Sequence, residues 1–118
     1  MKALDTLFTL INDGKVTAYT SFVTLIEVLT KPMEENNEEL SKKYADLLTN
    51  SEHLTLIDID RDIAIETAKL RAKYKIKVPD AIQLTAGIVN NAGVFVTNDT
   101  NLKKVKEIKV IVLDDLLK

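Results

Sequence analysis

Short apolar, β-branched stretches alternate with helical segments along this chain of 118 residues. The expected strands are residues 16–20, 54–59, 94–97 and 109–113, and the expected helices are residues 2–12, 21–29, a stretch that starts within 34–39, 60–74 and 79–91. Apolar strands need cover on both faces, which crossover helices between parallel strands supply. The alternation therefore predicts an α/β fold, a three-layer sandwich with a mainly parallel sheet.

Several residues are placed to start or stop these helices. Ser21 can cap the helix that follows it, and Pro32 is expected to help to terminate that helix. Either Asp60 or Asp62 can begin the helix that runs to residue 74. Pro79 suits the first turn of the next helix, because a helix leaves that amide unbonded in any case.

Composition limits the size of the protein and the chemistry open to it. With 46% hydrophobic residues, a chain of this length supports one domain with one core, residues 1–118. It has no apolar run of transmembrane length and no signal-peptide pattern, so we expect a cytoplasmic protein without membrane contact. It has no cysteine and one histidine, His53, so any metal ion must be held by oxygen atoms.

Three acidic residues interrupt apolar segments at points where a helix begins or a strand ends. They are Glu27 in Ser21-Phe-Val-Thr-Leu-Ile-Glu, Asp80 in Val78-Pro-Asp-Ala and Asp99 in Val94-Phe-Val-Thr-Asn-Asp. Carboxylates and water are the ligands that Mg²⁺ and Mn²⁺ prefer, with positions left over for a phosphodiester. The trio predicts a site for a hard divalent cation.

Each of these carboxylates also has a simpler interpretation. Asp99 can cap the next helix, worth about 1 kcal/mol, and Asp80 is favoured by the helix dipole by roughly 0.3–1 kcal/mol. Glu27 lies in a helix that is apolar on most sides, so it should be paired, metal-bound or on a narrow exposed stripe with Lys31. Taken singly, Asp80 and Asp99 are explained by the helix ends.

Two longer segments point to a known family. Ala68-Lys-Leu-Arg-Ala-Lys-Tyr-Lys-Ile-Lys-Val-Pro-Asp-Ala-Ile-Gln-Leu and Val94-Phe-Val-Thr-Asn-Asp-Thr-Asn-Leu-Lys-Lys resemble the third and fourth motifs of the PIN-domain ribonucleases. That family includes the VapC-like toxins of type II toxin–antitoxin systems. The resemblance extends from about Val16 to the end of the chain.

The resemblance implies a function for the acidic trio. Glu27, Asp80 and Asp99 would be catalytic residues that hold Mg²⁺ or Mn²⁺, and the substrate would be single-stranded RNA. Thr97 and Asn98 would orient Asp99, water or a phosphate, although ordinary turn chemistry also explains them. The implied partner is a small antitoxin whose peptide covers the acidic cleft, and the family commonly forms homodimers. With this resemblance, we prefer one joint metal site to three independent caps.

The N-terminal end departs from the family pattern. Family members open on a strand ending in Asp-Thr-Asn, which carries the first of four acidic residues. Asp5-Thr6 is a poor match, because residues 2–12 have helical periodicity ending at Gly14 and because Asp5 lies only 22 residues before Glu27. The chain is thus expected to lack the strand that lies in the middle of the family's sheet.

Three explanations are open for the missing strand: the natural protein is longer, the two half-sheets close directly, or another chain lends a strand. We favour truncation, and we expect this chain alone to bind metal weakly and to cleave poorly. Without the first acidic residue, the alternative function is a catalytically impaired PIN-like module that binds RNA or a protein partner.

Two other patterns carry less weight. Asp58-Ile-Asp60-Arg-Asp62 lies at the end of an expected strand and resembles the strand-end Asp-x-Asp pattern of magnesium phosphotransferases. Capping of the next helix explains these residues better. A phosphoacceptor receiver domain would need an early acidic pair that we do not find. Although the net charge is −2, lysines cluster near Asp80 and Asp99, where they are either an RNA-binding surface or ordinary solvated lysines.

Overall fold

The computed structural model describes residues 9, 13–14, 17–97 and 99–112. Most of the expected N-terminal helix, residues 2–12, therefore lies outside the described residues, as do Asn98 and the end of the last expected strand. Within the described part, Thr9 is helical and its carbonyl accepts a hydrogen bond from the Asp13 amide at 3.0 Å. Gly14 has a φ of 76°, as in the left-handed residue that commonly follows a helix.

Helices and parallel strands alternate as the sequence predicts. In chain order the elements are β1 (Ala18–Ser21), α2 (Phe22–Glu34), α3 (Glu38–Asn50), β2 (Leu54–Ile57), α4 (Arg61–Tyr74), α5 (Val78–Val89), β3 (Val94–Thr97), the 3₁₀ helix η1 (Thr100–Lys104) and β4 (Lys109–Val112). The prediction of an α/β fold is confirmed.

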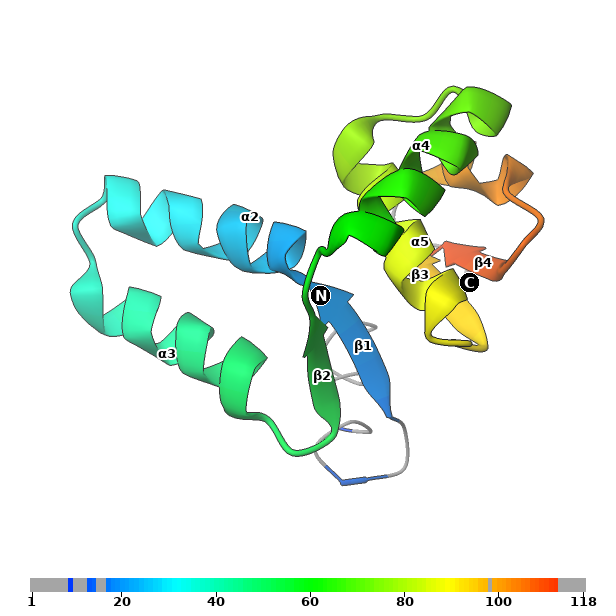
Figure 1. The fold of residues 1–118 in the computed structure, drawn as a ribbon. Coiled ribbons are helices and arrows are strands. Elements are labelled where there is room, and N and C mark those ends of the chain that lie inside the picture. The colour runs from blue at the N-terminus through cyan, green and yellow to red at the C-terminus, as the bar shows by residue number, and fades with distance from the viewer. Residues whose placement is uncertain (1–8, 10–12, 15–16, 98, 113–118) are drawn as a thin grey trace.

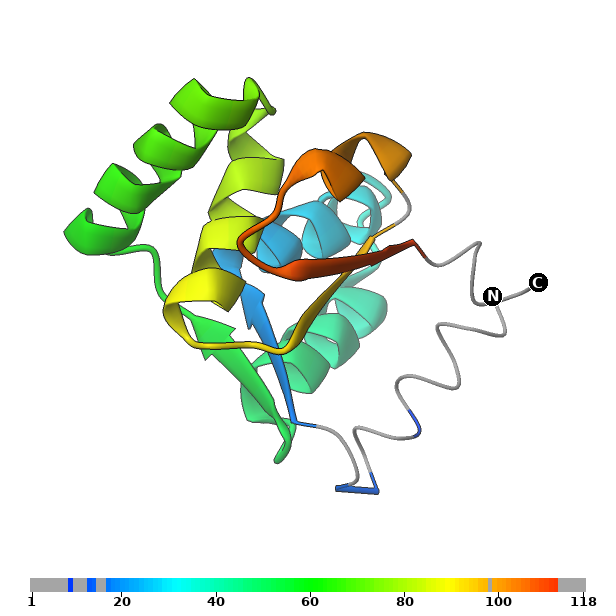
Figure 2. The same cartoon turned by 90° about the vertical axis from the view of Figure 1, so that its right-hand side faces the viewer.

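Within the described residues, the four strands form two separate sheets of two strands each, instead of one continuous sheet. Strand β1 pairs with β2 in parallel, with Ala18 opposite Leu54, and β3 pairs with β4 in parallel, with Val94 opposite Lys109. The hairpin of α2 and α3 lies on one side of β1–β2, and α4 and α5 lie on the other (Figures 1 and 2). The parallel pairing was predicted correctly, whereas the sheet is divided in two.

Most local boundary signals act as expected. The Ser21 hydroxyl caps α2 by accepting from the Val23 amide at 3.2 Å, and the Asp60 carboxylate caps α4 by accepting from the Ile63 amide at 2.9 Å. Pro79 lies in the first turn of α5. The prediction for Pro32 is wrong: it lies inside α2, which continues to Glu34. A proline in the last turn removes one backbone hydrogen bond, and α2 continues for two more residues beyond it.

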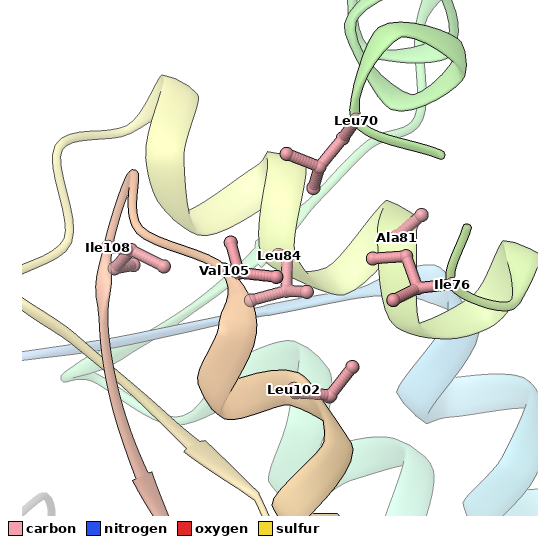
Figure 3. Packing of buried hydrophobic residues seen from close by; sticks show 7 residues of the cluster. All are labelled: Leu70, Ile76, Ala81, Leu84, Leu102, Val105 and Ile108. Atoms are coloured by element: carbon pink, nitrogen blue, oxygen red, sulfur yellow. The ribbon is translucent and has the colours of Figure 1, made fainter. Parts of the chain in front are cut away.

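The main apolar cluster lies in the C-terminal half of the chain. Its buried members come from α4, α5, η1 and the loops between them: Leu70, Ile76, Ala81, Leu84, Leu102, Val105 and Ile108 (Figure 3). Leu84 in the middle of α5 is fully buried, and Leu102 of η1 is 1% exposed. This packing fixes the start of α5, which carries Asp80, against η1, which follows Asp99.

Candidate functional site

Glu27 lies on α2 and is exposed to solvent. A carboxylate that is exposed to solvent keeps its hydration, so it requires neither a charged partner nor a metal ion. The sequence left three environments open for Glu27: an ion pair, a metal site or an exposed stripe. In the structure Glu27 is on the exposed side of α2. The described residues include no ion pair between Glu27 and Lys31.

Asp80 lies in the first turn of α5 and is half-buried. Helix α5 has no side chain that caps its N-terminus, because Lys77 occupies the cap position. Negative charge is favoured in this turn, because the first amides of a helix are not bonded within it. Local structure alone is sufficient to explain an acidic residue at this position.

Asp99 caps the 3₁₀ helix η1, as the simpler interpretation of the sequence predicts. Its Oδ1 atom accepts a hydrogen bond from the Asn101 amide at 2.9 Å. Thr97 also touches this residue, because its hydroxyl oxygen accepts from the Asp99 amide at 3.1 Å. Thr97 thus holds the backbone of Asp99, and Asn98 lies outside the described residues.

A network of hydroxyl and amide groups that the sequence did not predict joins α2 to α5. The Ser21 hydroxyl, which is fully buried, donates to Gln83 Oε1 at 2.7 Å, and the Gln83 amide donates to the hydroxyl of Thr24. Thr20 in turn donates to Thr24 at 2.7 Å. The start of α2 is therefore joined to the middle of α5 by side chains that are far apart in sequence.

This network lies one helical turn from two of the candidate carboxylates. Glu27 follows Thr24 by three residues on α2, and Asp80 precedes Gln83 by three residues on α5. Residues three apart are neighbours on a helix surface. The sequence signal was the run of Thr20, Ser21 and Thr24 at a strand-to-helix junction, which is more polar than capping alone requires.

The described residues contain no group of three or more histidine, cysteine, aspartate or glutamate side chains that could hold a metal ion. The types of donor still suit a hard cation, because all three candidates are carboxylates and the chain has no cysteine. The joint site of Glu27, Asp80 and Asp99 therefore stays a prediction. Its ligands are present but are not gathered into one cluster in the described arrangement.

The second acidic pattern lines a shallow hollow at the end of β2. Asp58, Asp60 and Asp62 surround it with Asn90 from the end of α5. Asp60 is the cap of α4, which confirms the capping interpretation for that residue. No metal-binding group of three forms here either, within the part of the chain that the structure describes.

Comparison with known proteins identifies the family. The PIN domain family model matches residues 3–108. The chain belongs to the PIN domain family. No curated protein sequence matches the chain.

Two solved structures contain chains with a similar fold. One is a toxin–antitoxin complex from Klebsiella pneumoniae, with a TM-score of 0.62 and 23% identity over 79% of this chain and 71% of that chain. The other is VapBC2 from Rickettsia felis bound to a DNA fragment from their promoter, with a TM-score of 0.69 and 19% identity over 92% of this chain and 83% of that chain. At these identities, the likeness supports the PIN fold.

Proposed function

We propose that this PIN domain is a metal-dependent endoribonuclease that cleaves single-stranded RNA, as the toxin of a toxin–antitoxin pair. The observation that carries the proposal is the family match over residues 3–108. The fold shared with chains of toxin–antitoxin complexes supports the toxin assignment. We further infer that the protein works in the cytoplasm; no helix in the described residues is long and apolar enough to cross a membrane.

In this proposal Glu27, Asp80 and Asp99 hold Mg²⁺ or Mn²⁺, and Thr97 and Asn98 orient Asp99. A divalent cation at such a site offsets negative charge on phosphate oxygens and lowers the pKa of water. The support from this chain is the placement of Asp80 at the start of α5 and the contact between Thr97 and the Asp99 amide. Because no three-carboxylate group forms among the described residues, we expect weak binding of metal by this chain alone.

The proposed antitoxin would cover apolar surface beside the carboxylates. Helix α2 carries Glu27 and also exposes Ile26 and Met33, which are 66% and 59% accessible. Exposed apolar side chains on one helix are a common docking surface for a partner segment. We infer that an antitoxin segment packs on this helix and that the toxin itself is a homodimer.

Titration of Mn²⁺ or Mg²⁺ by calorimetry tests the metal site, with Asp80→Asn as the variant. Cleavage of a single-stranded RNA is measured on the same samples. Binding that is weak in the parent chain and lost in Asp80→Asn supports the site, and cleavage that follows the same pattern supports the nuclease. Equal binding by the two proteins would refute the role of Asp80.

The second candidate function is a catalytically impaired PIN-like module that binds RNA or a protein partner. The observation in its favour is that the described residues assemble no metal-binding group of three. RNA binding without metal binding or cleavage in the same experiment would select this function.

A further inference from the structure

The charge of this protein is strongly segregated. Residues 69–77 contain five basic residues and no acidic residue, and residues 103–109 contain four basic residues and one acidic residue. These two short segments therefore hold nine of the 16 basic residues and only one of the 18 acidic residues, in a chain whose net charge is −2. The rest of the chain is correspondingly acidic in net charge, so these two segments are where a polyanion is most strongly attracted.

Contacts between side chains hold the two basic segments together. The Tyr74 hydroxyl donates to the Glu107 carboxylate and accepts from the Lys106 amide at 3.1 Å. Lys73 Nζ lies 3.2 Å from Glu107 Oε2. The hydrogen bond from Tyr74 lowers the pKa of Glu107, so this carboxylate stays ionised and engaged with its neighbours. The one acidic residue of the two segments is thus used internally.

Buried residues alternate with the lysines in both segments. Ile76 is 3% exposed between Lys75 and Lys77, and Val105 is 2% exposed between Lys104 and Lys106. Ile76 and Val105 belong to the same apolar cluster (Figure 3). With these side chains anchored in the core, the four lysines are left on the outside, where all are exposed. We name Lys75, Lys77, Lys104 and Lys106 the lysine surface.

The backbone of the lysine surface is held in place. Lys75 adopts the left-handed conformation that ends α4, and its amide donates to the Arg71 carbonyl at 2.7 Å. Arg71 Nε also donates to the Ile76 carbonyl at 3.0 Å. Among the described residues none of the four lysines takes part in an ion pair, so their ammonium groups are available to a ligand.

We propose that the lysine surface binds the phosphate backbone of single-stranded RNA and leads the strand toward Asp80 and Asp99. Asp80 follows Lys77 by three residues, and η1 joins Asp99 to Lys104. Lysines contact phosphates as point charges, and Tyr74, the aromatic residue beside them, has its hydroxyl engaged and is half-buried. Binding is therefore salt-dependent and insensitive to base sequence. This inference rests on the proposed ribonuclease function, whose substrate it positions.

Fluorescence anisotropy with a labelled oligouridylate in EDTA tests the proposal, because the proposed nuclease needs a divalent metal to cleave the probe. Lys75→Gln/Lys104→Gln removes one lysine from each segment, and Lys42→Gln/Lys43→Gln removes two exposed lysines from α3 as the matched control. We expect the first variant to lose about tenfold in affinity at low salt, and its slope of log K against log salt to fall by about 1.4. The control variant should bind as the parent chain does. Circular dichroism checks that both variants are folded.

Three results would overturn the proposal: no binding by the parent chain at low salt, equal losses in the two variants, or equally tight binding of polyglutamate at the same charge. The last result would mean a site for acidic proteins. Since this assay contains no metal, its failure is distinct from a failure of the nuclease. If the parent chain binds RNA as expected but does not cleave it when metal is added, only the proposed nuclease function is refuted.

Discussion

The two halves of the molecule are packed very differently. The C-terminal half, from α4 to β4, contains the buried cluster around Leu84 and Leu102. In the hairpin of α2 and α3, only Pro32 and Leu48 of these two described helices are buried, although α2 is rich in apolar residues. The C-terminal half therefore has the packing of a complete core. The hairpin has apolar surface that its own chain, as far as the structure describes it, leaves exposed.

Truncation in the core should have the largest effect. Leu84→Ala removes a fully buried side chain from the centre of α5. We expect a loss of about 2–5 kcal/mol in the free energy of unfolding, measured by urea denaturation. A loss below about 1 kcal/mol would show that the C-terminal half is as loosely packed as the hairpin.

The junction between the halves should come next. Ser21→Ala removes the cap of α2 and leaves Gln83 Oε1 without its donor from Ser21. We expect a loss of about 1–2 kcal/mol by the same measurement. Thr30→Ala, which removes an exposed hydroxyl bonded within α2, is the control and should have much less effect. If the two variants lost equal stability, the network would not couple the halves.

The contact of Glu107 with Tyr74 and Lys73 should contribute a small, pH-dependent part of the stability. The Tyr74 hydrogen bond lowers the pKa of Glu107, so the contribution is complete above the unfolded pKa and is lost as pH falls through the lower folded value. The hydrogen bond to Glu107 raises the pKa of Lys73, so its contribution is lost only as pH rises through that raised value.

Glu107→Gln should therefore lower the urea midpoint slightly at pH 7 and leave it unchanged in strong acid. A double-mutant cycle with Lys73→Gln assigns the effect to the pair. The urea midpoints of the parent chain and Glu107→Gln are compared from pH 7 into strong acid. If the difference between the two midpoints stays constant over this range, this account is wrong.

Substitution on the exposed face of the hairpin should have the smallest effect. Ile26→Ser replaces a side chain that is 66% accessible, and the free energy of unfolding should change by less than about 0.5 kcal/mol. A loss comparable with that of Leu84→Ala would mean that Ile26 is covered in solution, by a second copy of the chain or by another segment. Sedimentation of the same samples distinguishes the two cases.

Local rules predicted most of the fold. Ser21, Asp60 and Pro79 set helix starts that nearest-neighbour chemistry determines, and the structure confirms each of them. Pro32 was misjudged because a proline in the last turn of a helix costs only one backbone hydrogen bond, and its own ring is buried in α2. The division of the sheet depends on which strands meet in space, and no local pattern determines that.

The candidate site was less predictable than the fold. The cap at Asp99 and its contact with Thr97 are local and could be anticipated. The bonds of Gln83 to Ser21 and Thr24 join segments about 60 residues apart, so only the folded chain brings them together. The position of Glu27 relative to Asp80 and Asp99 depends on the same long-range packing, which one sequence does not specify.

The two parallel pairs differ in how much chain must be organised before they form. Strand β3 reaches β4 across the short η1 segment, whereas β1 reaches β2 only after both helices of the hairpin have been crossed. Closing a longer loop costs more entropy, so the local pair should form earlier during folding. In pulse-labelled hydrogen exchange, the amides of Val94–Thr97 should therefore gain protection before those of Ala18–Ser21.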